Sequence, residues 1–138
     1  YEMDLNRLSE RELAEIKDQV TFMKKWRRLL QYGTFFRLKS PFDGNIASWM
    51  TVSDDRSQAI VGWYRILNSV NPPYTRMKLA GLDPDRLYKV SKDGVFLGEF
   101  YGDELMNVGL ITSDACSGES PDAPDASHDF ESRIYILE

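Results

Sequence analysis

The hydrophobic pattern of this chain changes its period at Gly33. Over residues 8–31, apolar residues recur every three or four positions, which is the spacing of one face of an α-helix. Ser9 and Glu12 have the spacing of a capping box at the start of that helix, and glycine commonly follows a helix end. The pattern predicts an amphipathic helix whose apolar face is formed by Leu13, Ile16, Val20 and Met23.

After Gly33 the apolar residues fall into short runs that are rich in β-branched and aromatic side chains. Turn-forming sequences separate the runs, and this spacing predicts antiparallel strands. Residues 59–67 are apolar on both faces, so we expect a central strand that is covered on both sides. The predicted fold class is mainly β: an antiparallel β-sandwich of Greek-key type that follows one amphipathic α-helix. Its seven expected strands are residues 34–38, 47–52, 59–67, 75–79, 86–90, 95–101 and 130–137.

The charge of the chain is unevenly distributed. Residues 1–39 hold nine Lys and Arg against six Asp and Glu, whereas residues 40–138 hold eight against sixteen, and the formal net charge is −5. An acidic chain of this kind is a poor partner for a phosphate backbone, so we expect no nucleic-acid binding. No run approaches the ~18 apolar residues of a membrane helix, so we expect no membrane contact.

Cysteine and histidine each occur once, as Cys116 and His128. These counts exclude an internal disulfide, a cysteine-based zinc site and every multi-histidine metal site. Both residues lie in 112–129, a segment rich in Ser, Asp, Pro and Ala that has five acids and no base. We expect this segment to be a mobile acidic loop, and we expect no metal and no cofactor.

Three pairs of carboxylates have the residue type that general acid–base catalysis uses. All three lie in predicted turns, where Asp is favoured for its local hydrogen bonds. We therefore predict that the chain holds no catalytic residue and that the pairs shape turns. They are Asp54 with Asp55, Asp83 with Asp85, and Asp103 with Glu104.

A basic cluster surrounds Trp26 in the sequence Lys24-Lys25-Trp26-Arg27-Arg28. Basic residues interleaved with an aromatic can bind nucleic acids or anionic membranes. Cations are also stabilising near a helix C-terminus, and the rest of the chain is acidic. We therefore favour a helix end in which Trp26 is a core anchor.

Two tryptophans, Trp49 and Trp63, lie in the middle of predicted strands. Together with Tyr64 and Tyr101 they have the amphipathic rings that form sugar-stacking platforms in binding sites. A sandwich core of this size also uses several aromatic residues, and we favour that role. Trp49 and Trp63 are the candidate sugar contacts of the chain.

A more specific signal comes from five longer stretches: residues 31–38 (QYGTFFRL), 40–45 (SPFDGN), 49–53 (WMTVS), 79–88 (LAGLDPDRLY) and 101–110 (YGDELMNVGL). In this order they closely resemble the C-terminal region of family 36 glycoside hydrolases, the bacterial α-galactosidases. Residues 130–137 fit that family's final strand. Residues 2–5 and the capped helix resemble the last strand and helix of its (β/α)₈ catalytic barrel.

The resemblance implies a division of the chain. Residues 1–32 are expected to be the last strand remnant and helix of the barrel, and residues 33–138 the C-terminal β-sandwich domain with its acidic loop at 112–129. The start at Tyr1 is expected of a piece of a longer protein. That family's nucleophile and acid/base are aspartates on barrel strands upstream of Tyr1, so the resemblance assigns no catalytic, cofactor-binding or metal-binding residue here.

By the same resemblance the parent protein is a retaining α-galactosidase, a cytoplasmic enzyme that acts on terminal α-linked galactose of raffinose-type oligosaccharides without a cofactor. This piece would be structural, with the apolar helix face docked on the rest of the parent chain. It would meet an α-galactoside only through that parent, which is expected to be a homo-oligomer. Two alternatives stay open: a carbohydrate-binding module that uses strand aromatics, and an oligomerisation domain.

Overall fold

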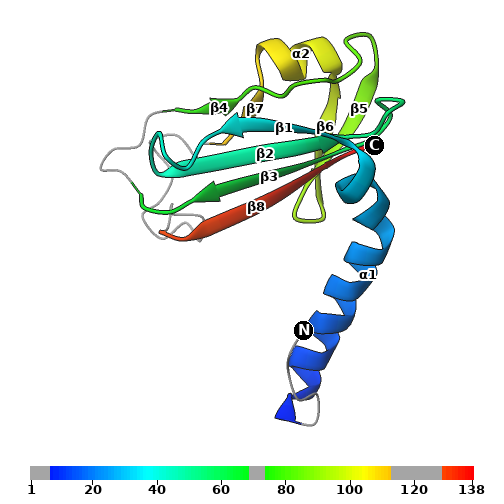
Figure 1. The fold of residues 1–138 in the computed structure, drawn as a ribbon, viewed down its shortest axis with the longest axis vertical. Coiled ribbons are helices and arrows are strands. Elements are labelled where there is room, and N and C mark those ends of the chain that lie inside the picture. Colours follow the sequence, from blue (N-terminus) through cyan, green and yellow to red (C-terminus); the bar gives the residue numbers. More distant parts are fainter. Residues whose placement is uncertain (1–6, 69–73, 113–128) are drawn as a thin grey trace.

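The computed structural model describes residues 7–68, 74–112 and 129–138. The predicted barrel strand at residues 2–5, together with Cys116 and His128, lies outside the described residues, as does the acidic loop except for Thr112 and Asp129. Within the described residues, eight strands and two helices form a mainly β fold with a long helix at its N-terminal side (Figure 1). The predicted fold class is confirmed.

Helix α1 (Glu10–Tyr32) begins with the predicted capping box. The Ser9 hydroxyl accepts a hydrogen bond from the Glu12 amide at 3.3 Å, and the Glu12 carboxylate accepts one from the Ser9 amide at 2.8 Å. Amide groups that a helix start leaves unpaired are thereby satisfied. Neither α1 nor the other helix in the described part of the chain is long and apolar enough to cross a membrane.

Gly33 ends the helix because of a close approach between chain segments. Its backbone is extended, with φ −69° and ψ 163°, so it does not take the left-handed conformation common after helix ends. A Cβ at this position would lie 2.6 Å from Thr51 Cγ2 and 2.7 Å from the Leu29 carbonyl oxygen. Glycine is needed here because no side chain fits between these neighbours.

Six antiparallel strands form the main sheet in the order β1-β2-β3-β8-β5-β6. A second, two-stranded sheet and the short helix α2 (Gly102–Asn107) lie over one face of the main sheet (Figure 1). The main-sheet strands are β1 (Thr34–Lys39), β2 (Ile46–Val52), β3 (Ala59–Arg65), β5 (Leu87–Lys92), β6 (Val95–Tyr101) and β8 (Glu131–Leu137). The second sheet pairs β4 (Arg76–Met77) with β7 (Leu110–Ile111).

The last strand, β8, is inserted between β3 and β5. The chain reaches this position only after it has built the β5–β6 hairpin and contributed β7 to the second sheet, which is a Greek-key type of connection. Strand β3 pairs with β2 on one side and β8 on the other along its whole length, and nearly all of its residues are buried. The predicted central strand is therefore confirmed.

The main core lies between the six-stranded sheet and the second layer. Trp63, Tyr88 and Tyr135 are its largest fully buried side chains. Because two layers close over one core, the fold is a sandwich whose second layer is short. That layer and its connections contribute Met77, Leu79, Leu82, Leu105 and Leu110.

Two short elements differ from the prediction. Asp103 and Glu104 lie in the first turn of helix α2, so the predicted turn at this pair is wrong. Strand β7 has no counterpart among the seven expected strands. Helix α2 has six residues and β7 has two, and neither is long enough to show a hydrophobic period.

Candidate functional site

Helix α1 rests on the outer face of the main sheet through its C-terminal half, while its N-terminal half extends away from the sheet (Figure 1). Trp26 and Leu29 are buried against Ile60 of β3. Trp26 is only 4% exposed, which confirms the prediction that it is a core anchor. The partly buried side chains around this cluster are Phe22, Leu30, Trp49, Ile134 and Ile136.

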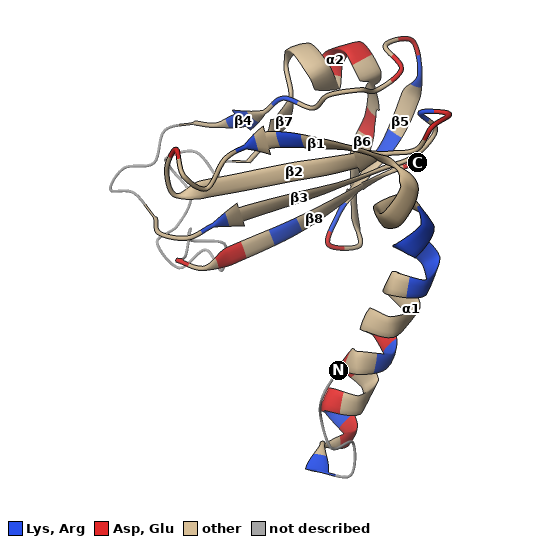
Figure 2. Cartoon of the chain, in the orientation of Figure 1, with Lys and Arg blue, Asp and Glu red and all other residues tan. Residues whose placement is uncertain are grey.

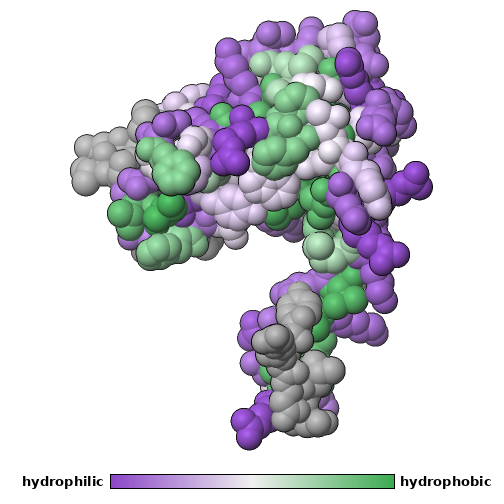
Figure 3. Space-filling model, viewed as in Figure 1, coloured by the Kyte–Doolittle hydropathy of each residue, from purple (hydrophilic) through white to green (hydrophobic). Residues whose placement is uncertain are grey.

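The predicted apolar face of α1 (Leu13, Ile16, Val20 and Met23) is largely uncovered. Leu13 is 39% exposed and Met23 is 48% exposed, and the other two side chains are half-buried. Figure 3 shows hydrophobic side chains on α1 close to its junction with the sheet. Exposed apolar side chains that recur along one helix face commonly mark a contact with another protein surface.

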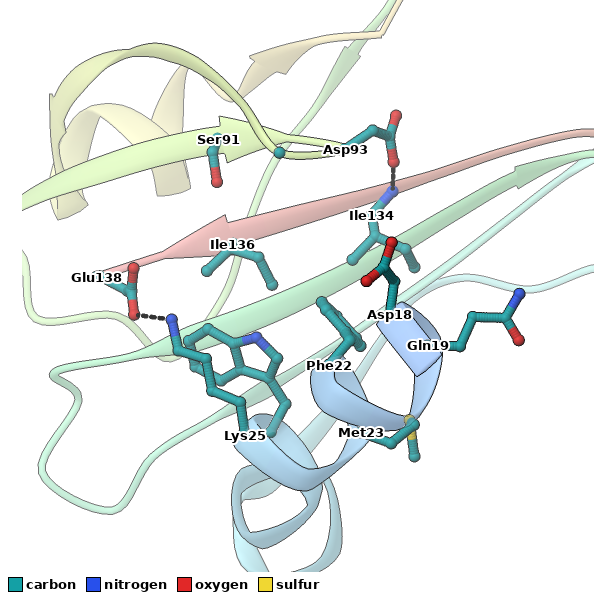
Figure 4. Close-up of a pocket in the computed structure, with 12 residues that line it drawn as sticks. Asp18, Gln19, Phe22, Met23, Lys25, Ser91, Asp93, Ile134, Ile136 and Glu138 are labelled. Carbon is teal, nitrogen blue, oxygen red and sulfur yellow. Dashed lines mark hydrogen bonds and ion pairs between the residues drawn. The ribbon is translucent and has the colours of Figure 1, made fainter. Parts of the chain in front are cut away.

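A groove of about 720 Å³ lies between α1 and the outer face of the main sheet. Its floor is apolar, with Phe22 and Trp26 from α1 and Ile134 and Ile136 from β8 (Figure 4). The turn between β5 and β6 supplies the opposite wall. We call this feature the α1 groove; its lining is completed by Asp18, Gln19, Met23, Lys25, Ser91, Asp93, Gly94 and Glu138.

Two polar contacts fix the walls of the α1 groove. The Lys25 ammonium donates to the Glu138 carboxylate at 2.9 Å and lies 4.3 Å from the centre of the Trp26 ring. Asp93 accepts from the Ile134 amide at 2.9 Å through its carboxylate and donates to the Ile134 carbonyl oxygen through its own amide at 2.9 Å (Figure 4). The first contact joins α1 to the end of β8, and the second joins the β5–β6 turn to β8.

The basic cluster stands one turn before the end of α1, and the last turn carries no base. Lys and Arg gather in this C-terminal half of the helix (Figure 2). Since Trp26 is buried and Lys25 is paired with Glu138, the central aromatic and one cation of the cluster hold α1 on the sheet.

The two candidate sugar contacts have different surroundings. Trp63 is 2% exposed, and the guanidinium carbons of Arg65 and Arg133 lie 4.9 and 4.7 Å from its ring centre. Trp49 is half-buried on the opposite face, where its ring covers Gly62 and stacks on the exposed Phe35 with ring centres 6.3 Å apart. Of the two rings, that of Trp49 is therefore the more accessible to solvent.

The predicted turn role fits two of the three carboxylate pairs. In the β2–β3 turn, Asp55 accepts hydrogen bonds from the hydroxyls of Ser53 and Ser57 and from the Ser57 amide, and these bonds lower the pKa of its carboxyl to about 2. Asp83 accepts from the Asp85 amide at 3.1 Å. Within the described residues, no cluster of three or more His, Cys, Asp or Glu side chains has the arrangement of a metal site.

The family described as Glycosyl hydrolase family 36 C-terminal domain matches residues 46–137 of this chain. The chain belongs to this family. The α-galactosidase AgaA from Geobacillus stearothermophilus is 47% identical to this chain over 137 residues. The matched residues are 99% of this chain and 17% of AgaA.

Solved structures agree with the sequence match. The crystal structure of the α-galactosidase AgaB from the same organism superposes on this chain with a TM-score of 0.81 and 44% sequence identity. The superposition covers 98% of this chain and 17% of the AgaB chain. A variant of AgaA in complex with raffinose superposes with a TM-score of 0.79 and 41% identity, over 98% of this chain and 17% of the AgaA chain. The family 36 domain thus spans about a sixth of the length of these relatives.

Sequence reasoning found the apolar face of α1 but missed the α1 groove. The groove joins residues from α1, the β5–β6 turn and β8, and only the tertiary fold brings these segments together. One signal was present in the sequence: in β8, Ile134 and Ile136 alternate with Tyr135 and Leu137, so both faces of this strand are apolar. Such a strand indicates a second contact surface outside the main core.

Proposed function

We propose that this family 36 domain is the C-terminal part of an α-galactosidase and serves that enzyme as a structural domain. The observation that carries the proposal is the uncovered apolar face of α1. An amphipathic helix of this kind buries its apolar stripe in a folded protein, and the described residues of this chain cover only its C-terminal half. The remainder of the parent chain would cover the rest.

The proposed division places residues 1–32 with the catalytic barrel, as its last strand and helix, and residues 33–138 in the sandwich. Two features support it. The N-terminal half of α1 extends away from the sheet (Figure 1), and the close packing at Gly33 marks the point where helix gives way to strand. Leu13 and its neighbours on the apolar face would then pack inside the parent protein.

The proposed reaction is the retaining hydrolysis of terminal α-linked galactose from raffinose-type oligosaccharides. Support for the substrate class comes from the relative that was solved with raffinose. Retention uses two carboxyl groups about 5 Å apart, one as nucleophile and one as acid/base, and both would lie in the rest of the parent chain. We further propose a cytoplasmic homo-oligomer that works in carbohydrate metabolism.

Hydrogen exchange tests the structural role. In the isolated chain, amides in the first three turns of α1 should exchange quickly, because their apolar face is uncovered and the capping box and the exposed Arg11–Glu15 ion pair stabilise the helix start only weakly. In the longer parent chain the same amides should be strongly protected. Equal protection in both chains would contradict the proposal.

A second candidate function is sugar binding by the domain itself, favoured by the half-buried Trp49 and its exposed neighbour Phe35. Stacking of a galactose ring on Trp49 would change its fluorescence. Titration with galactose or raffinose should then quench the tryptophan fluorescence of the wild type but not that of W49F. In W49F the ring at position 49 is smaller and is no longer a tryptophan that reports on binding. An unchanged spectrum of the wild type at millimolar sugar would exclude this function.

A further inference from the structure

We propose that the α1 groove holds a segment of the remaining parent chain that inserts an apolar side chain and carries a Lys or Arg between Asp18 and Asp93. This inference rests on the proposed function, since the segment comes from the part of the α-galactosidase outside these 138 residues. It adds to the proposed docking of α1 the chemical character of the segment that would bind there, which is apolar and basic.

The shape and lining of the groove favour an inserted apolar side chain. Its volume of about 720 Å³ is within the range of pockets that hold ligands and side chains. Phe22, Ile134 and Ile136 form the floor and stay only partly buried in this chain. Burial of such a floor by an apolar group is favourable by roughly 25 cal/mol per Å².

Apolar surface continues beyond the groove on both sides. Met23 on the helix wall is largely exposed, and it also belongs to the apolar face of α1. On the other wall, Gly94 is followed directly by the exposed Val95 and Phe96. The groove is therefore bordered by further exposed apolar side chains, as expected where one segment is inserted and its flanks are covered.

The charges of the groove select a basic partner. Among its four charged residues, Lys25 and Glu138 pair with each other at 2.9 Å. Asp18 on the helix wall and Asp93 on the turn wall pair with no cation among the described residues (Figure 4). One unpaired carboxylate on each wall above an apolar floor is complementary to a segment that carries a cation next to its apolar anchor.

The position of Asp93 is held by the fold. Its amide and one carboxylate oxygen both bond to Ile134, and its backbone has a positive φ of 49°. Asn tolerates this conformation and keeps the accepting oxygen, so D93N removes the charge and preserves the turn. Asp18 lies on the exposed side of a regular helix turn, where D18N is equally mild.

The source of the segment follows from the family match. This chain covers 17% of the length of AgaA and of AgaB, so about five sixths of such a protein lies outside it. The apolar face of α1 and the groove share Met23, and a parent chain that docks on one therefore reaches the other. A second copy of this chain is the competing occupant.

The test compares D18N/D93N with the control D43N/D54N, which removes two charges from exposed turns away from the groove. Hydrogen exchange of the α1 amides around Phe22 is followed in the parent chain and in the isolated chain at low salt. In the parent, D18N/D93N should speed exchange about tenfold, as expected for the loss of a partly buried ion pair, and the control should have no effect. In the isolated chain neither variant should change the rate.

Three results would overturn the inference: an unchanged rate for D18N/D93N in the parent, an equal acceleration in the isolated chain, or a protection in the isolated chain that rises with its concentration. The last result would identify a second copy as the occupant. The proposed function fails separately, since it predicts that the wild-type α1 amides near Leu13 are more protected in the parent than in the isolated chain.

Discussion

Replacement of Leu13 by Asp distinguishes a docking helix from one that belongs to the sandwich. Leu13 lies four residues after the N-cap Ser9, in the half of α1 that extends away from the sheet, and 39% of it is exposed. In the isolated chain, L13D should therefore cost only the difference in helix propensity and some local contact, about 0.5–1 kcal/mol.

Trp26→Ala is the matched comparison on the same helix. Trp26 is buried against Leu29 and Ile60, and removal of a buried tryptophan costs about 3–5 kcal/mol. Urea unfolding followed by far-UV circular dichroism gives both free energies of unfolding, and the two variants should differ by at least about 2 kcal/mol in the isolated chain.

The difference between the two variants should shrink once the parent chain is present. There, L13D would place an unpaired carboxylate in a packed apolar contact, which costs several kcal/mol. Its cost should approach that of Trp26→Ala. If L13D already destabilises the isolated chain as much as Trp26→Ala does, α1 is packed along its whole length within this chain and the docking account is refuted.

Two other residues give independent predictions. The pKa of the Asp55 carboxyl is lowered to about 2, below the unfolded value near 3.9. Asp55 therefore stabilises the fold above about pH 4, and this contribution is lost as the pH falls toward 2. D55N should flatten this part of the stability–pH curve measured by urea unfolding, and an unchanged acid limb would contradict the assignment. Gly102→Ala should destabilise the chain by about 1–3 kcal/mol or more, because a Cβ there would lie 1.9 Å from the Asp83 carbonyl oxygen. Gly94→Ala is its steric control, since a Cβ at Gly94 meets no atom within 4 Å, although its φ of 85° adds backbone strain. Thermal unfolding should show a larger loss of stability for Gly102→Ala than for Gly94→Ala. The reverse order would refute the steric explanation.

The elements that were predicted correctly are those whose signals are local. The capping box at Ser9 and Glu12 needs only four consecutive residues, and the strands from β1 to β3 follow from short apolar runs between turns. Trp26 was predicted as a core anchor because its cluster occurs near the end of a strongly periodic helix. The family resemblance itself is confirmed by the family match over residues 46–137.

The features that were missed depend on contacts between distant segments. Nothing near residue 131 indicates that β8 pairs with β3 and β5, because that position is set by the crossover through the second sheet. Gly33 was predicted to follow the end of the helix, but the close approach of Thr51, which requires glycine there, is not visible in the sequence. The α1 groove likewise exists only once α1, the β5–β6 turn and β8 are assembled.

A side-by-side α-galactosidase assay tests the central claim most directly. Hydrolysis of raffinose and of an α-galactoside of p-nitrophenol is measured with the isolated chain and with the parent chain that contains it. The account predicts an active parent and an inert isolated chain, because the two catalytic carboxylates would lie in the rest of the parent. Activity in the isolated chain would contradict it, and the carboxylate pairs assigned to turns at Asp54 and Asp83 would then be the first candidates for catalysis.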